Sequence, residues 1–264
     1  MAHPQHHNPH LPNTFFPILP LRLMHPLSRY LRALSELSRL RREGGRLRFG
    51  LSSVSASDIA AQFYCERKVE FRYTVGRIRT QEMMEGENRH AKLVEKAVRK
   101  TPEEILRSAL EGKPVWATEL FLASSFGGVF VTGKPDALVF EGGRPIRVVE
   151  YKFTEARTPA HYHHVQARVY CLLLRSLGMD TSHLKYVIFL LPPSSSPPFD
   201  RISKLVLEGG GEEGVFLFEP DWERGRRELI WALQYWKGRR EAQPTATKIR
   251  CESCEYRERC LPVG

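Results

Sequence analysis

Two glycine pairs that interrupt a strand-like stretch constrain this chain more than any other feature. Helical spacing gives way near residue 115 to runs with strand character over residues 115–123, 128–140 and 145–154. Gly127-Gly128 and Gly142-Gly143 separate these runs. Paired glycines adopt the positive φ angles of tight hairpin turns at little steric cost. The sequence therefore predicts three consecutive strands joined by tight turns at the centre of the molecule.

Helical and strand patterns on both sides of this stretch predict a mixed α/β core. Ser57-Asp58 can cap a helix that runs on to Val69 with Cys65 inside it, and a second helix should cover roughly residues 82–100. Further helices are expected at 159–177 and 221–240. A buried strand is expected at 184–191, and weaker strands are expected near 202–207 and 215–219.

The first 50 residues differ from the rest of the chain. Residues 1–20 are rich in proline and histidine without periodicity, and residues 21–42 form an amphipathic basic helix that should end at Gly44-Gly45. Their composition is that of an organellar transit peptide. We favour an accessory helix packed on the domain, or an upstream extension with Met24 as an internal start. The expected division is a basic extension at 1–50 and a compact domain at 51–264.

Composition narrows the class of protein. The net charge is +10, but residues 1–50 alone carry eight arginines against two glutamates. An excess of basic over acidic side chains favours binding to a polyanion. No apolar run approaches the roughly 18 residues of a membrane helix, so no membrane association is expected. Five cysteines in 264 residues do not resemble a disulfide scaffold, which favours a metal site in a reducing, cytoplasmic compartment.

Candidate catalytic residues lie within the strand-like stretch. Side chains alternate between the two faces of a strand, so Glu150 and Lys152 should share one face with Val148. Lys152 would then hold Glu150 ionised, and Asp136 on a neighbouring strand would supply a second carboxylate. Such a pair suits Mg²⁺ or Mn²⁺, which prefer oxygen ligands. Taken alone, Glu150-x-Lys152 is more often a solvated strand face, with Asp136 as a turn residue.

Four short motifs in this order resemble the PD-(D/E)xK nuclease core in its RecB-like form. These motifs are Gly86-x-x-x-His90, Gly133-x-x-Asp136, Glu150-x-Lys152 and Gln166-x-x-x-Tyr170. The resemblance implies a restriction-endonuclease-like mixed sheet flanked by helices. It also implies a metal held by His90, Asp136, Glu150 and the backbone carbonyl of Tyr151. Lys152 would be the catalytic lysine, with Gln166 and Tyr170 on one helical face orienting DNA or the lysine.

The cysteines indicate a second metal centre. Cys251-x-x-Cys254 and Cys260 supply three thiolates, and a fourth ligand must come from elsewhere. Cys65 lies in a polar setting, whereas Cys171 lies in an apolar helical stretch and is best interpreted as a small buried hydrophobe. One cysteine before the core and three after it resembles the iron–sulfur nucleases, which implies a [4Fe–4S] cluster. Zinc is the competing metal, and spacing alone does not decide between them.

The resemblance is strongest to the CRISPR-associated RecB-like exonucleases and covers roughly residues 51–264. Glu66 departs from the proline that commonly follows the first cysteine there. The resemblance implies 5′ to 3′ degradation of single-stranded DNA or frayed ends and processing of spacer precursors. One alternative is a DNA-end-binding iron–sulfur subunit of the spacer-integration complex with weak nuclease activity. A repair nuclease unconnected with CRISPR is another, and homo-oligomerisation stays open.

Overall fold

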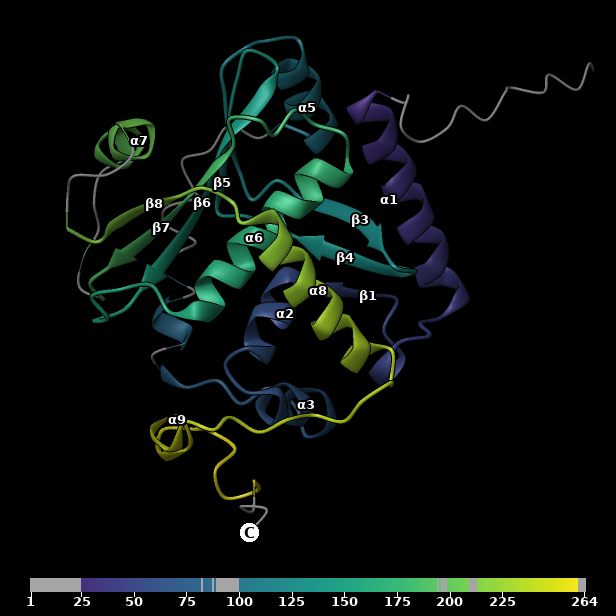
Figure 1. The fold of residues 1–264 in the computed structure, drawn as a ribbon, viewed down its shortest axis with the longest axis vertical. Coiled ribbons are helices and arrows are strands. Elements are labelled where there is room, and N and C mark those ends of the chain that lie inside the picture. The colour runs from purple at the N-terminus through teal and green to yellow at the C-terminus, as the bar shows by residue number, and fades with distance from the viewer. Residues whose placement is uncertain are drawn as a thin grey trace, which may run out of the picture.

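The computed structural model describes residues 25–81, 83–86, 88, 100–193, 195, 199–208 and 213–260. Two sheets form its centre (Figure 1). The smaller has the order β1-β4-β3, with β1 (Ser53–Ser55) parallel and β3 (Leu122–Phe126) antiparallel to β4 (Val129–Gly133). The larger has the order β2-β5-β6-β7-β8. Both sheets are therefore mixed, as the resemblance implied.

Parallel pairing of two long strands gives the larger sheet its centre. β6 (Arg144–Phe153) and β7 (Lys185–Leu191) are parallel, and α6 (His161–Ser176) connects them. The remaining pairs are antiparallel and involve β2 (Val115–Thr118), β5 (Ala137–Glu141) and β8 (Val215–Phe218). Glycine pairs 127–128 and 142–143 have positive φ and form the β3–β4 and β5–β6 turns, which confirms the two predicted turns.

Helix α6 covers one face of the larger sheet and also contacts β3 and β4 of the smaller one (Figure 1). Two further helices, α2 (Ala56–Gln62) and α8 (Trp222–Trp236), pack on α6. The other face of the larger sheet is covered by α7 (Phe199–Glu208), through Ile202, Leu205 and Val206. Residues 202–207 were predicted as a strand, which is wrong. The apolar residues at i, i+3 and i+4 fit a helix.

The predicted strand at 128–140 is in fact two strands in different sheets. β4 ends at Gly133 and β5 begins at Ala137, so the chain leaves the smaller sheet and enters the larger one through Lys134-Pro135-Asp136. Proline has no N–H to donate to a strand neighbour, which favours a break there. The predicted strand at 115–123 divides in the same way into β2 and β3, around Glu119 with its positive φ of 48°.

Cys65 does not lie inside a helix as predicted. α2 ends at Gln62, Cys65 has an extended backbone with φ −168°, and α3 (Glu66–Thr74) begins at the next residue. The N–H groups of Tyr64 and Cys65 both donate to the Ala61 carbonyl, which closes the first helix and turns the chain. Cys65 therefore occupies the position just before α3.

Helix α1 (Pro26–Glu43) packs on the domain through Tyr30 and Leu37, which are buried against β3 and β4. It ends at Gly44, as predicted. The short helix η2 (Arg48–Gly50) follows, and Arg48 donates to the carbonyls of Tyr235 and Arg240. The first 24 residues, and most of the second predicted helix including His90, lie outside the described residues.

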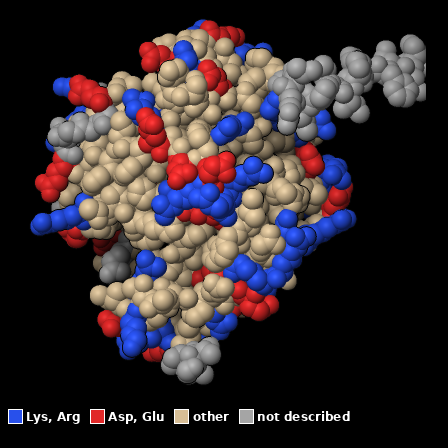
Figure 2. Space-filling view, viewed as in Figure 1, with Lys and Arg blue, Asp and Glu red and all other residues tan. Residues whose placement is uncertain are grey.

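The remaining helices lie at the margins. α5 (Pro102–Leu110) is closed by a capping box between Thr101 and Glu104, and α9 (Lys248–Glu252) lies in the C-terminal tail. Basic and acidic side chains are interspersed over the face that carries α8, and basic ones gather along the end of α1 (Figure 2). None of the helices that the structure describes has the length and apolar character of a membrane span.

Candidate active site

The candidate site begins on β6, whose two faces differ in chemistry. Val149 and Tyr151 pack into the cluster beneath α7, whereas Val148 belongs to the core on the α6 side. Glu150 and Lys152 follow Val148 at alternate positions and therefore share the α6 face. The predicted division of this strand is confirmed, and it places a buried carboxylate and a lysine beneath the first turns of α6.

Asp136 lies opposite Glu150 because of the β5–β6 register. Ala137 pairs with Val149, so the residue before Ala137 meets the residue after Val149. The Asp136 Oδ2 atom accepts a hydrogen bond of 2.6 Å from the Tyr151 backbone N–H. Both carboxylates are nearly out of contact with solvent, at 8% exposure for Asp136 and 2% for Glu150. The structure thus brings the two predicted carboxylates to one edge of the sheet.

Lys152 is held between two partners. Its Nζ atom lies 2.6 Å from Glu150 Oε1 and donates to Gln166 Oε1 at 3.0 Å. Burial by itself lowers the pKa of this ammonium, but attraction to Glu150 and Asp136 and the hydrogen bond to Glu150 outweigh it, so the pKa is raised. Lys152 is therefore a cation at neutral pH and donates hydrogen bonds.

Gln166 and Tyr170 orient this lysine from one face of α6. The Gln166 Nε2 atom donates to the Tyr170 hydroxyl at 2.8 Å and to Ser57 Oγ at 3.4 Å, which leaves its oxygen for Lys152. The Tyr170 hydroxyl in turn donates to the Lys134 carbonyl at 3.2 Å. Burial raises the pKa of Tyr170 well above its usual value, so the phenol stays neutral. Sequence reasoning considered Ser57 only as a helix cap.

Gly133 makes room for the Tyr170 ring. A Cβ atom at this position would lie 2.6 Å from Cε1 and 2.8 Å from Cδ1 of that ring. These separations are shorter than any packed pair of carbon atoms tolerates. The glycine of the Gly133-x-x-Asp136 motif therefore has a steric reason, since a side chain at this position would displace the Tyr170 ring, whose hydroxyl contacts the neighbouring Lys134 carbonyl.

The donor chemistry at this edge fits a hard divalent cation. Asp136 and Glu150 offer carboxylate oxygens, which Mg²⁺ and Mn²⁺ prefer. The carbonyl of Tyr151 belongs to the same strand, and His90 lies outside the described residues. Within the part of the chain that the structure describes, no three histidine, cysteine, aspartate or glutamate side chains gather into a group able to hold a metal.

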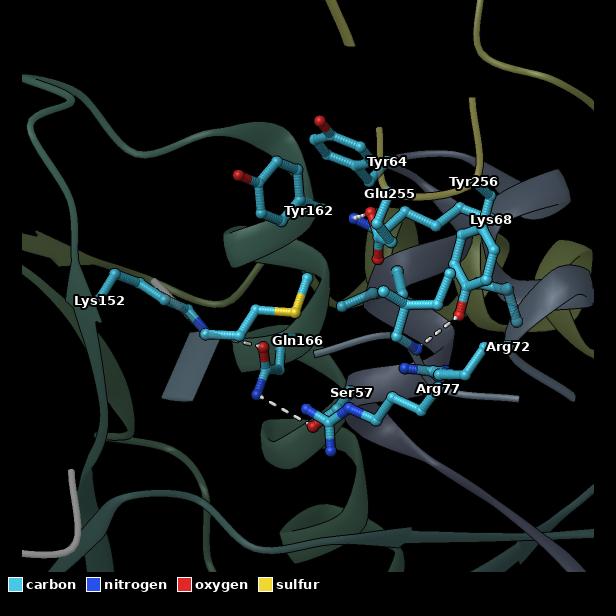
Figure 3. A pocket seen from close by; sticks show the side chains of 15 residues that line it. Ser57, Tyr64, Lys68, Arg72, Arg77, Lys152, Tyr162, Gln166, Glu255 and Tyr256 are labelled. Carbon is cyan, nitrogen blue, oxygen red and sulfur yellow. Dashed lines mark hydrogen bonds and ion pairs between the residues drawn. The ribbon is translucent and has the colours of Figure 1, made fainter. Parts of the chain in front are cut away.

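A cavity of about 370 Å³ opens beside Lys152 and Gln166 (Figure 3). Sequence reasoning missed most of its lining, which includes Lys68 and Arg72 of α3, Arg77, Tyr64 and Tyr162. A signal was present, because residues 67–79 interleave basic and aromatic side chains, a pattern typical of single-strand nucleic-acid binding. Asp58, which the sequence marked only as part of a cap, pairs with Arg72 at this cavity and accepts from Tyr73 at 2.9 Å.

The C-terminal tail docks against the region of Cys65. Arg250 donates to the carbonyls of Phe63 and Tyr64, and Lys68 pairs with Glu255 at 2.8 Å. Burial raises the pKa of the Cys254 thiol, and Cys65 is near enough to raise it further. All five cysteines are free thiols, and Cys171 is fully buried in α6.

Comparisons with known proteins bear on this arrangement. The crystal structure of SSO0001 is 15% identical over 80% of this chain and 87% of that chain, with a TM-score of 0.45. That of a proposed exonuclease from Eubacterium rectale is 11% identical over 81% and 90%, with a TM-score of 0.49. The search of curated proteins gave no match. The sequence profile of the PD-(D/E)XK nuclease superfamily matches residues 52–261, a span that contains both carboxylates, the lysine and all five cysteines. The chain therefore belongs to the PD-(D/E)XK nuclease superfamily.

Proposed function

We propose that the protein is a divalent-metal-dependent deoxyribonuclease that acts as an exonuclease on single-stranded DNA or frayed ends. The observation that carries this proposal is the position of Lys152, held between Glu150 and Gln166 beside Asp136. Membership of a nuclease superfamily supports the reaction class. The sequence resemblance supports the preference for strand ends.

Phosphodiester hydrolysis needs an activated water and compensation of the charge on the phosphoryl oxygens. Mg²⁺ or Mn²⁺ held by Asp136 and Glu150, with His90 and the Tyr151 carbonyl as the further expected ligands, would lower the pKa of a bound water and neutralise phosphate charge. The further positive charge and the groups that hold it in place are supplied by the protein's own side chains.

Lys152 supplies a fixed positive charge to this reaction. An ammonium group has no lone pair with which to take a proton from water, so its role is to donate hydrogen bonds to water or phosphate. Gln166 keeps the ammonium in place, and Tyr170 keeps the Gln166 amide in place. A preorganised donor of this kind stabilises charge without rearranging during the reaction.

The biological role we propose is the trimming of spacer precursors in CRISPR adaptation, with 5′ to 3′ polarity. This part rests on the resemblance to CRISPR-associated RecB-like exonucleases. A DNA-end-binding subunit of the spacer-integration complex with weak nuclease activity, or a repair nuclease, would have the same residues. Genomic neighbours that encode spacer integration would favour the first role.

We also propose that Cys65, Cys251, Cys254 and Cys260 bind a [4Fe–4S] cluster, with zinc as the less favoured metal. The supporting observation is that the tail carrying three of these cysteines docks beside Cys65, where Arg250 donates to the carbonyls of Phe63 and Tyr64 and Glu255 pairs with Lys68. Thiolates suit either metal. A brown protein after purification without air supports the cluster, and a colourless protein with stoichiometric zinc contradicts it.

The nuclease proposal is tested by cleavage of labelled single-stranded DNA in Mn²⁺. Lys152→Ala and Asp136→Ala should each lower the rate by roughly a hundredfold or more, while DNA binding is largely kept. Lys134→Ala is the matched control, because it removes an exposed lysine near the site whose side chain lies outside the lysine–glutamine network. Undiminished cleavage by both site variants would refute the active-site assignment.

A further inference from the structure

The cavity beside Lys152 has the size of a single-nucleotide site. Its volume of about 370 Å³ is at the lower end of the roughly 300–1,000 Å³ typical of small-ligand pockets. Lys152, Gln166 and Ser57 line one side, and Lys68, Glu255 and Tyr256 lie across from them (Figure 3). A duplex does not fit this volume. One nucleotide next to the reacting phosphate does.

The charge of the lining suits a phosphate. Four of the lining residues are cations, Lys68, Arg72, Arg77 and Lys152. Lys68 pairs with Glu255 of the lining, and Arg72 and Lys152 pair with Asp58 and Glu150 just outside it, so the cavity keeps a modest positive excess. The side chain of Arg77 extends toward Ser57, which is on the same side as Lys152 (Figure 3). A phosphate beside Lys152 would therefore also be within the field of Arg77, and guanidinium groups bind phosphate with charge-assisted hydrogen bonds.

Two tyrosines offer a surface for a base. Tyr64 and Tyr162 line the cavity, and their rings meet edge to face with centroids 5.5 Å apart. Bases stack on aromatic side chains without regard to sequence. Tyr162 lies in the first turn of α6, one turn before Gln166, which contacts Lys152. The base of a nucleotide whose phosphate is held at Lys152 could therefore lie against Tyr162.

The C-terminal tail closes the side away from Lys152. Tyr256 is 2% exposed, and its hydroxyl donates to the Gly76 carbonyl at 2.8 Å. Glu255 is fixed by its ion pair with Lys68. A strand that continued past the cavity would have to displace this wall and bring its next phosphate toward the Glu255 carboxylate. The cavity therefore accepts an end of a strand rather than its middle.

We propose that this cavity binds the terminal nucleotide of a single DNA strand, with its phosphate between Lys152 and Arg77 and its base against Tyr64 and Tyr162. The proposal deepens the exonuclease assignment and rests on it. It gives a structural reason for cutting at ends, because the tail limits how far a strand can enter. The geometry is compatible with either end of the strand.

The first experiment compares a linear single strand with a covalently closed circle of the same sequence, both labelled internally. The wild-type protein should degrade the linear strand and leave the circle intact. Equal cleavage of both would overturn the proposal. Linear strands blocked at the 5′ or the 3′ end then show which terminus enters the cavity.

The second experiment measures binding without cleavage. Thymidine monophosphate should displace a fluorescent oligothymidylate in EDTA, and thymidine should do so far less well. Arg77→Ala should weaken displacement by the monophosphate about tenfold, the usual effect of one lost charge-assisted contact. Arg79→Ala is the matched control, because Arg79 is also exposed but is not among the residues that line the cavity. Equal effects of the two substitutions would refute a phosphate site here.

The same displacement assay tests the aromatic surface. Tyr162→Phe keeps the ring and should bind like the wild type, whereas Tyr162→Ala should lose several-fold in affinity. If Tyr162→Ala binds the monophosphate as well as the wild type does, the base does not contact Tyr162. Since EDTA suppresses metal-dependent cleavage, these results stand even if the protein cleaves no DNA, which separates failure of the cavity proposal from failure of the nuclease proposal.

Discussion

The carboxylate–lysine centre and the cysteine region are held together in different ways. In the first, strand register places the buried carboxylates Asp136 and Glu150 side by side, and hydrogen bonds hold Lys152 between Glu150 and Gln166. In the second, Cys251 is exposed, Cys254 is partly exposed, and the tail is docked by ion pairs and a few hydrogen bonds. Contacts within the fold therefore position the carboxylates and the lysine of the first region, whereas the thiols of the second are held by the docking of the tail.

Substitutions in the two regions should therefore have different effects, on cleavage in the first region and on docking of the tail in the second. A change at the carboxylate–lysine centre should leave a folded protein that does not cleave. A change in the cysteine region should release the tail, which also forms the far wall of the cavity through Glu255 and Tyr256. If these cysteines bind the proposed cluster, its loss would alter the proposed end recognition before it alters the positions of Asp136 and Glu150.

The largest effect is expected from Cys65→Ser. If Cys65 is a cluster ligand, this variant should lose the iron–sulfur absorption completely and expose the tail to proteolysis, because the metal is part of the folded state. Cys171→Ser is the control. It removes a thiol buried among apolar side chains of α6 and should keep the absorption. If Cys171→Ser loses the absorption and Cys65→Ser keeps it, the fourth ligand is Cys171 and not Cys65.

A smaller but substantial effect is expected from Glu66→Ala. Glu66 is 1% exposed and accepts two hydrogen bonds of 2.6 Å from Arg240, one from Gln62 and one from the Gln243 backbone N–H. Its loss leaves the largely buried guanidinium of Arg240 without its carboxylate partner, which should lower the free energy of unfolding by roughly 3–5 kcal/mol.

Glu241→Ala is the matched control for Glu66→Ala, whose hydrogen bonds with Arg240, Gln62 and Gln243 are called here the Glu66 clamp. Glu241 pairs with Arg48 at 3.0 Å, but its side chain is 83% exposed, so the loss should stay below about 1 kcal/mol. Denaturant unfolding of both variants gives the comparison. Equal losses would mean that the Glu66 clamp stabilises the protein no more than a surface ion pair does. The clamp also suggests why this chain does not need proline after Cys65, since Glu66 itself fixes the turn to the tail.

Local patterns predicted the site better than the fold around it. Alternation along β6 placed Glu150 and Lys152 on one face, and i, i+4 spacing placed Gln166 and Tyr170 together. These inferences need only the geometry of one element. The passage of the chain from one sheet to the other at Pro135 was missed, because it depends on which distant strand each segment meets.

The cavity was missed for the same reason. Its walls come from α2, α3 and the segment after it, β6, α6 and the C-terminal tail, most of which are far apart in sequence. Arg77 carries no local pattern that distinguishes it from Arg79, although only Arg77 lines the cavity. Tertiary packing decides between them, so a single sequence cannot.

The smallest effect that still discriminates is expected from Gly133→Ala. The added methyl would overlap the Tyr170 ring and lie 3.1 Å from Leu173 Cδ1, so the ring must shift. Overpacking of this kind should lower the free energy of unfolding by roughly 1–3 kcal/mol. Because the shift draws the phenol away from Gln166, the turnover rate should fall more than DNA affinity does. Gly86→Ala, whose Cβ meets no atom within 4 Å, serves as the stability control. If Gly133→Ala lowers stability but keeps full turnover, Tyr170 stabilises the packing of α6 and does not position Lys152. The carboxylate–lysine centre would then be arranged without the help of Tyr170.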